Sequence, residues 1–143
     1  MKMEEIKMTD NELKKILDNH KHYLLKDIDG WVDMRACLHG ADLRYVNLRN
    51  VNLSGADLSY VNLRNADLSG ADLSYANLCN ADLSGADFIG SNLCNSKLYN
   101  AKLRYSILLN ANLCNADLSS TDLRGADLSG ANLIDAKLDY AKL

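Results

Sequence analysis

A five-residue repeat runs without interruption through most of this chain. From residue 36 to residue 143, a small residue is followed two positions later by Leu or Phe, through 22 successive units. The small residue is Ala in 15 units, and the larger one is Leu everywhere except Phe88. This period suits neither a 3.6-residue helix nor a long alternating strand. It predicts a solenoid, in which each unit buries its apolar atoms only against neighbouring units.

The repeat also carries a family resemblance. The consensus of the pentapeptide-repeat proteins resembles several runs of this chain, among them Ala56-Asp57-Leu58-Ser59 and Ala66-Asp67-Leu68-Ser69-Gly70. The resemblance implies an all-β solenoid, a right-handed quadrilateral parallel β-helix with four units in each 20-residue coil, and therefore about five and a half coils in this chain. The absence of Pro agrees, because stacked coils use their backbone N–H groups between coils.

The first 35 residues break the repeat, so the chain divides into a capping segment, 1–35, and a repeat region, 36–143. Thr9 and Glu12 form a capping-box pattern, which predicts a helix that begins at Asp10. A solenoid needs its first coil covered. The residues predicted to form this N-terminal cap are Leu13, Ile16, Leu17, His20, Leu24 and Trp31.

The amino terminus does not have the pattern of a targeting signal. Residues 1–12 are dense in Lys and Glu and lack the apolar stretch of a signal peptide. No run approaches the roughly 20 apolar residues of a membrane span. The sequence therefore predicts a cytoplasmic protein without a membrane partner.

Enzymatic activity, cofactors and metal binding have little support. A packed Leu interior leaves no substrate cavity, and the three His residues accompany no nucleophile motif. His20 and His22 point in different directions on a helix, which favours packing and surface roles over metal binding. Cys94 and Cys114 fall on adjacent coils and can reach one another, but a reduced pair is expected in the cytoplasm. Cys79 lies on another face, which argues against a zinc site.

Charge bears on the activity that the resemblance implies, namely inhibition or protection of DNA gyrase and other type II topoisomerases by mimicry of duplex DNA. A duplex carries about one negative charge per 1.7 Å, whereas no face of the predicted rod has a net charge beyond −2. The opposite hypothesis, direct nucleic-acid binding, rests on one face with six basic and three acidic residues. The sequence pI near 5.5 argues against it.

Two departures from the repeat point to protein–protein interaction. An outward semi-apolar surface is predicted to be a partner site; the alternative is sequence drift at surface positions that tolerate substitution. The residues of this surface are Ile89, Ile107, Leu109, Cys94, Cys114 and Ile134. The last coil carries no capping helix, which predicts a homodimer through its edge, formed by Leu128, Leu133, Leu138 and Leu143. The predicted function is a non-enzymatic scaffold for an unknown protein partner, with topoisomerase modulation as the alternative.

Overall fold

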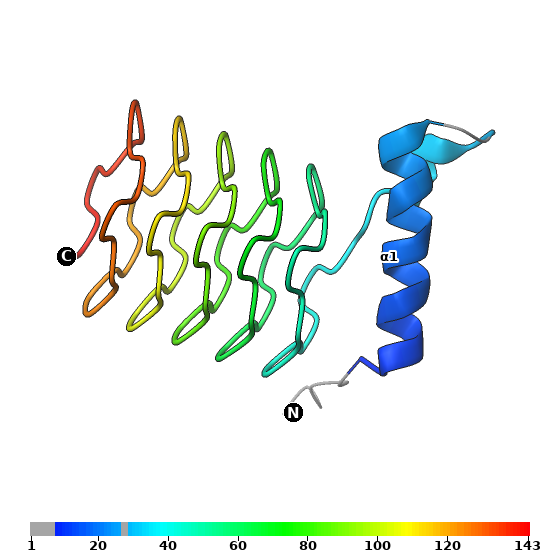
Figure 1. The fold of residues 1–143 in the computed structure, drawn as a ribbon, viewed down its shortest axis with the longest axis horizontal. Coiled ribbons are helices and arrows are strands. Elements are labelled where there is room, and N and C mark those ends of the chain that lie inside the picture. Colours follow the sequence, from blue (N-terminus) through cyan, green and yellow to red (C-terminus); the bar gives the residue numbers. More distant parts are fainter. Residues whose placement is uncertain (1–7, 27–28) are drawn as a thin grey trace, which may run out of the picture.

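The computed structural model describes residues 8–26 and 29–143 and shows a helix standing at one end of a stack of coils (Figure 1). Helix α1 spans Asp10–Leu25, and a 3-10 helix spans Trp31–Met34. The repeat follows, and the carboxyl terminus lies at the end of the stack away from α1. Within these residues, no helix has the length and apolar content to cross a bilayer.

Helix α1 begins where the sequence predicts. The Thr9 hydroxyl accepts the backbone N–H of Glu12 at 3.2 Å, and the Glu12 carboxylate accepts the backbone N–H of Thr9 at 2.8 Å. This reciprocal pair satisfies two N–H groups at the helix start. The helix ends at Lys26, whose left-handed backbone lets its N–H bond to the His22 carbonyl at 2.8 Å.

The coils stack through single parallel β-bridges, each between residues 20 apart, such as Cys37 with Asp57 and Asp57 with Asn77. From Leu38 to Leu123, the N–H of the central residue donates to a carbonyl of the following coil, as from Leu58 to Asn77 at 2.7 Å. Four units therefore complete one coil. These contacts and the interior described below form the pentapeptide-repeat β-helix that the sequence predicts; the division at residue 35 remains a prediction.

Each unit ends at a corner with a left-handed backbone. All the corner residues from Gly40 to Tyr140 have positive φ, and most of them are Gly or Asn, which tolerate this conformation. The Asp or Asn before the central residue stabilises the same turn: the Asp67 carboxylate accepts the Ser69 backbone N–H at 3.0 Å. This turn chemistry explains the recurring Asp or Asn of the repeat.

The central residues fill the interior. From Leu38 to Leu123 none of them is more than 4% exposed, and Phe88 is fully buried in this column. The small residues flank them because a larger side chain would not fit between coil and core. Where Ser or Thr replaces Ala, the hydroxyl needs an acceptor; that of Ser96 donates to the Leu93 carbonyl at 2.6 Å.

Candidate partner-binding surfaces

Three large apolar side chains point outward on two adjacent coils. Ile89 and Ile107 are 38% and 39% exposed, and Leu109 is half-buried. The N–H of Gly90 donates to the Leu109 carbonyl at 3.0 Å, so Ile89 lies one coil away from Leu109. We call Ile89, Ile107 and Leu109 the apolar patch. These three of the six residues of the predicted surface thus lie on one face.

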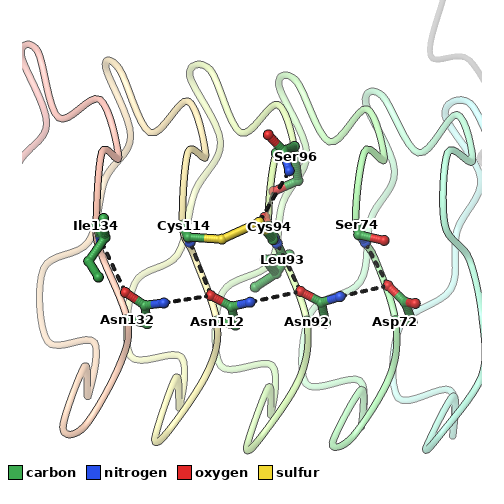
Figure 2. Close-up of a disulfide and its surroundings, with 11 residues drawn as sticks. Asp72, Ser74, Asn92, Leu93, Cys94, Ser96, Asn112, Cys114, Asn132 and Ile134 are labelled. Atoms are coloured by element: carbon green, nitrogen blue, oxygen red, sulfur yellow. Dashed lines mark hydrogen bonds between the residues drawn. A yellow bond between two sulfur atoms is a disulfide. The ribbon is translucent and has the colours of Figure 1, made fainter.

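The other predicted members form a row on the next face, beyond the corner at Gly90. Cys94, Cys114 and Ile134 follow one another on three successive coils, in line with Ser74 (Figure 2). Ile134 is 67% exposed. The predicted surface is therefore two rows on neighbouring faces, and its partner role remains a prediction.

Cys94 and Cys114 are joined by a disulfide, which corrects the expectation of a reduced pair. That expectation came from the predicted compartment, not from the geometry. Stacking holds the two Cα atoms 4.7 Å apart, which lies within the range that a disulfide can bridge. Cys37 and Cys79 carry free thiols, and burial raises the pKa of the Cys79 thiol.

A ladder of side-chain amides runs beside the disulfide (Figure 2). Asn132 donates to Asn112 at 3.0 Å, Asn112 to Asn92 at 3.2 Å, and Asn92 to the Asp72 carboxylate at 3.2 Å. The ladder adds hydrogen bonds between coils and leaves these amides engaged with one another. Its role is structural.

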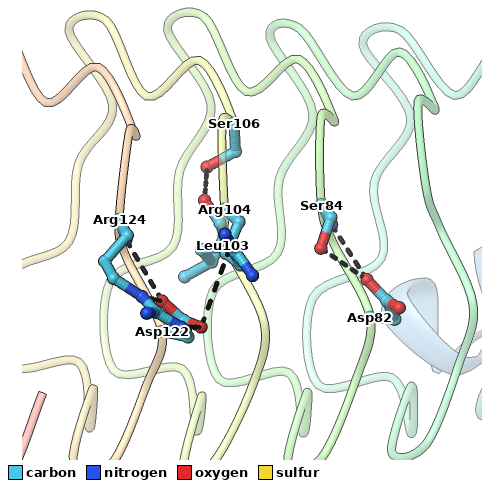
Figure 3. Close-up of polar contacts among 7 residues, drawn as sticks. All are labelled: Asp82, Ser84, Leu103, Arg104, Ser106, Asp122 and Arg124. Atoms are coloured by element: carbon cyan, nitrogen blue, oxygen red, sulfur yellow. Dashed lines mark hydrogen bonds and ion pairs between the residues drawn. The ribbon is translucent and has the colours of Figure 1, made fainter. Parts of the chain in front are cut away.

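The face with six basic and three acidic residues is called the basic face, and part of its positive charge is neutralised by ion pairs (Figure 3). The Arg124 guanidinium binds Asp122 through two contacts of 2.8 and 2.6 Å, and it holds the pKa of that carboxyl well below its usual range. Arg104 approaches the same carboxylate at 4.0 Å from the neighbouring coil. In the described part of the chain, no carboxylate lies within ion-pair distance of Arg64 or Lys102. The face therefore keeps a local positive excess.

Four of the residues predicted to form the N-terminal cap lie against the core, and their capping role remains a prediction. Leu13 and His20 are buried, and Ile16 and Leu17 pack against the core. The His20 Nδ1 atom accepts the Ala36 backbone N–H at 3.0 Å, and the ring stacks on Tyr23 with centroids 5.2 Å apart. Burial lowers the pKa of His20, against a smaller opposing effect of the Ser54 backbone. His20 therefore joins the helix to the first coil as a neutral ring.

The other two residues of the predicted cap are Leu24 and Trp31. Leu24 is half-buried. Trp31 opens the 3-10 helix, and its side chain lies outside what the structure describes.

Sequence reasoning missed a groove of about 880 Å³ between α1 and the first coil. Leu13 and Leu17 line it from the helix, and Val46 and Val51 line it from the coil. The available signal was Val at positions where most units carry Ala. Both Val side chains are half-buried, whereas the equivalent small residues of the next three coils are buried.

The C-terminal edge of the described stack exposes its interior column. Leu128 and Leu133 are half-buried, while Leu138 and Leu143 are 38% and 81% exposed. Within the described residues, the backbone N–H groups of Leu128, Leu133 and Leu138 meet no acceptor of a following coil. This edge combines exposed Leu side chains with unpaired backbone donors in the described residues, and its role in a homodimer remains a prediction.

The polar cluster at His39 does not form the triad of a hydrolase. His39 Nδ1 lies 2.8 Å from the Ser59 hydroxyl, which donates to the Asp57 carboxylate at 2.6 Å. In a hydrolase triad the acid orients His, whereas here Ser stands between His and Asp. Among the described residues, no group of three or more His, Cys, Asp or Glu could hold a metal ion.

A family model for pentapeptide repeats matches this chain in 8 copies, which together span residues 36–143. No protein in a curated collection of proteins matches it.

Solved structures of repeat proteins are similar to this chain. A pentapeptide repeat protein from Nostoc PCC 7120 is 34% identical over 80% of this chain and 71% of its own, with a TM-score of 0.42. One from the thylakoid lumen of Arabidopsis thaliana is 27% identical over 68% and 65%, with a TM-score of 0.43. QnrB1, a plasmid-mediated fluoroquinolone resistance protein, is 21% identical over 73% and 65%, with a TM-score of 0.40. The chain thus spans just under two thirds of the Arabidopsis protein and of QnrB1.

Proposed function

Because this chain belongs to the pentapeptide repeat family, which is generally non-catalytic, we propose that it is a non-enzymatic scaffold that binds a protein partner through the apolar patch. The observation that carries the proposal is the outward exposure of Ile89 and Ile107, with Leu109 beside them, on two adjacent coils.

The composition of the surrounding surface supports this choice. The outward positions equivalent to Ile89 and Leu109 on the other coils are Arg49, Ser69 and Ser129. A contiguous apolar patch with a polar rim is typical of a partner site. The half-exposed side chains would release water when a partner covers them, which supplies binding free energy.

A pair of matched variants tests the patch. Ile89→Lys with Leu109→Lys should abolish capture of a specific partner from a lysate of the source organism. Ser69→Lys with Ser129→Lys places the same charges in the same column and should leave that capture unchanged. If the apolar-patch variant folds normally and retains every partner, the patch is not the binding site.

We also propose homodimerisation through the C-terminal edge. Exposed Leu138 and Leu143 and the unpaired N–H groups there would be covered by the equivalent edge of a second copy. Unpaired edges of this kind readily pair with another chain.

Light scattering tests the dimer. Leu138→Lys with Leu143→Lys should convert a concentration-dependent dimer into a monomer. Leu25→Lys introduces a charge at another exposed apolar residue, which is 68% exposed, and should leave the dimer intact. A monomeric wild-type chain at high concentration would remove the proposal.

Topoisomerase modulation remains the alternative. The Asp residues of the described faces are largely engaged in turn hydrogen bonds, such as Asp67 with Ser69 and Asp127 with Ser129. No face has a net charge beyond −2, so none presents the continuous negative charge of a duplex. An assay of gyrase supercoiling with added protein tests this alternative directly. A cytoplasmic location likewise remains a prediction.

A further inference from the structure

The disulfide joins two coils that are already held together by other contacts. The Leu93 N–H donates to the Asn112 carbonyl at 2.7 Å, and the Asn112 N–H donates to the Ser91 carbonyl at 2.9 Å. The Asn95 N–H donates to the Cys114 carbonyl at 2.9 Å. None of these bonds involves sulfur, so the stack places the two thiols together and does not need the disulfide to form.

The same column shows that the fold tolerates other side chains there. Ser74 occupies the equivalent position one coil before Cys94, and Ile134 the position one coil after Cys114 (Figure 2). Ser54 lies one coil further toward α1. Cys94 and Cys114 are half-buried and therefore partly accessible to small molecules.

We propose that Cys94 and Cys114 form a reversible oxidation site that exchanges with small-molecule disulfides. In oxidation, the Cys114 thiolate attacks one sulfur of the small disulfide, forms a mixed disulfide and releases one thiolate. The Cys94 thiolate then attacks the Cys114 sulfur and releases the second thiolate. The protein loses two protons and two electrons, and the small disulfide becomes two thiols. Reduction runs the same steps backward.

A contact distinguishes the two sulfurs and sets this order. The Asn95 side-chain amide donates to the Cys94 sulfur at 3.1 Å. Asn115 holds the same corner one coil on, and within the described residues no side-chain amide donates to the Cys114 sulfur. A hydrogen bond to sulfur favours the thiolate. Cys94 is therefore the better leaving group in reduction and the resolving thiolate in oxidation.

The bond acts on the C-terminal half of the stack. It closes a loop with a sequence separation of 20. Unfolding of the coil between Cys94 and Cys114 therefore gains less chain entropy in the oxidised protein than in the reduced protein. In a repeat stack each coil contacts only its neighbours, so the effect stays local. Fraying that starts at the exposed edge near Leu138 should stop at Cys114 when the pair is oxidised.

Titration with glutathione and glutathione disulfide, followed by mass spectrometry of the whole chain, tests the chemistry. The wild type should lose two hydrogens at Cys94 and Cys114 without retaining glutathione, and excess reduced glutathione should restore both thiols. Cys94→Ser should instead accumulate glutathione on Cys114. A pair that stays reduced, that cannot be reduced in the folded protein, or that retains glutathione on both sulfurs would overturn the proposal.

Matched corner variants test the asymmetry. Asn95→Gly should slow exchange several-fold, because it removes the hydrogen bond to sulfur and keeps a residue that accepts the left-handed backbone. Asn115→Gly should leave the rate unchanged. Equal rates for the two variants would remove the assigned order of attack.

Hydrogen exchange of the backbone amides tests whether the disulfide stabilises its coil locally. Oxidation should slow exchange across residues 96–113 by on the order of a hundredfold, the entropic effect of a loop of this size, and leave residues 36–55 unchanged. Cys94→Ser should show no dependence on reductant, and it should fold because Ser occupies this column at positions 54 and 74. Exchange that is identical in oxidised and reduced wild type would contradict the local stabilisation.

Discussion

At the scale of single residues, the repeat is a sequence of turns in which each position has a distinct constraint. The corner requires positive φ, which costs about 1–2 kcal/mol for a residue with a side chain. Even so, several corners are occupied by Tyr, namely Tyr45, Tyr60, Tyr75, Tyr105 and Tyr140. The strain is tolerated because the surrounding backbone hydrogen bonds hold the turn.

Alanine substitutions at two corner glycines can distinguish the cost of backbone strain from the cost of side-chain crowding. Both Gly90→Ala and Gly125→Ala place a Cβ at positive φ, which should cost about 1–2 kcal/mol of unfolding free energy. At Gly90 the new atom meets open space, whereas at Gly125 it would lie 2.6 Å from a ring carbon of Tyr105. The ring must then leave Arg104, whose guanidinium lies 5.6 Å from the ring centroid, at a further ~0.5–1 kcal/mol.

Denaturant unfolding measures both variants. Tyr105→Gly should remove the excess cost at Gly125 and leave the cost at Gly90 unchanged. Equal costs for the two glycine variants in the wild-type background would contradict the role of the ring.

At the scale of elements, α1 stabilises the open face of the first coil through few contacts. Leu13 buries apolar surface, and the ring of His20 satisfies the Ala36 N–H. An unmade hydrogen bond at this buried site would cost about 1–3 kcal/mol. The docking of the helix therefore depends on the protonation state of one ring.

The docking of α1 should weaken in mild acid. Burial lowers the pKa of His20 in the folded chain, whereas an unfolded His titrates at about 6.5. Between the two values the undocked state binds a proton that the docked state does not, so stability falls as the pH falls below about 6.5. Thermal unfolding followed by the circular dichroism of the helix should show this decline.

A variant separates His20 from other titrating groups. His20→Gln keeps an acceptor and should make the helical signal independent of pH between about 5 and 7. His39 remains as the internal control, since it is exposed and contacts Ser59 away from α1. The same acid response in His20→Gln would assign it to another group.

At the scale of the whole molecule, each coil buries its interior only against its neighbours. A cavity in the middle of the stack therefore removes contacts on two sides, whereas a truncation at the edge removes few. The fully buried Leu73 and the exposed Leu143 represent these extremes.

Truncation at these two positions should differ strongly. Leu73→Ala should destabilise the chain by about 2–5 kcal/mol, the usual cost of a cavity in a packed interior. Leu143→Ala should cost well under 1 kcal/mol at protein concentrations where the chain is monomeric. Denaturant unfolding at low concentration measures both, and similar costs would show that the interior is not packed as described.

The sequence alone predicted a solenoid and the start of α1, and its resemblance to the pentapeptide-repeat proteins implied the β-helix and the 20-residue register. The reason is physical: with a strict five-residue period, each unit buries its Leu only against neighbouring units, and a capping box is a local signal. It also placed Ile89 and Leu109 on adjacent coils, because an uninterrupted register maps each outward position to a face.

Only the tertiary structure decided which neighbours bond. The pairing of Cys94 with Cys114, the seating of His20 against Ala36 and the groove beside Val46 depend on side-chain geometry and on how α1 rests on the first coil. The register places Cys94 beside Cys114 but does not decide whether their sulfurs bond. The contacts of α1 join parts of the chain with no shared period, so no repeat pattern encodes them. The interior follows from periodicity, whereas the features that distinguish this molecule come from contacts between coils and across the helix.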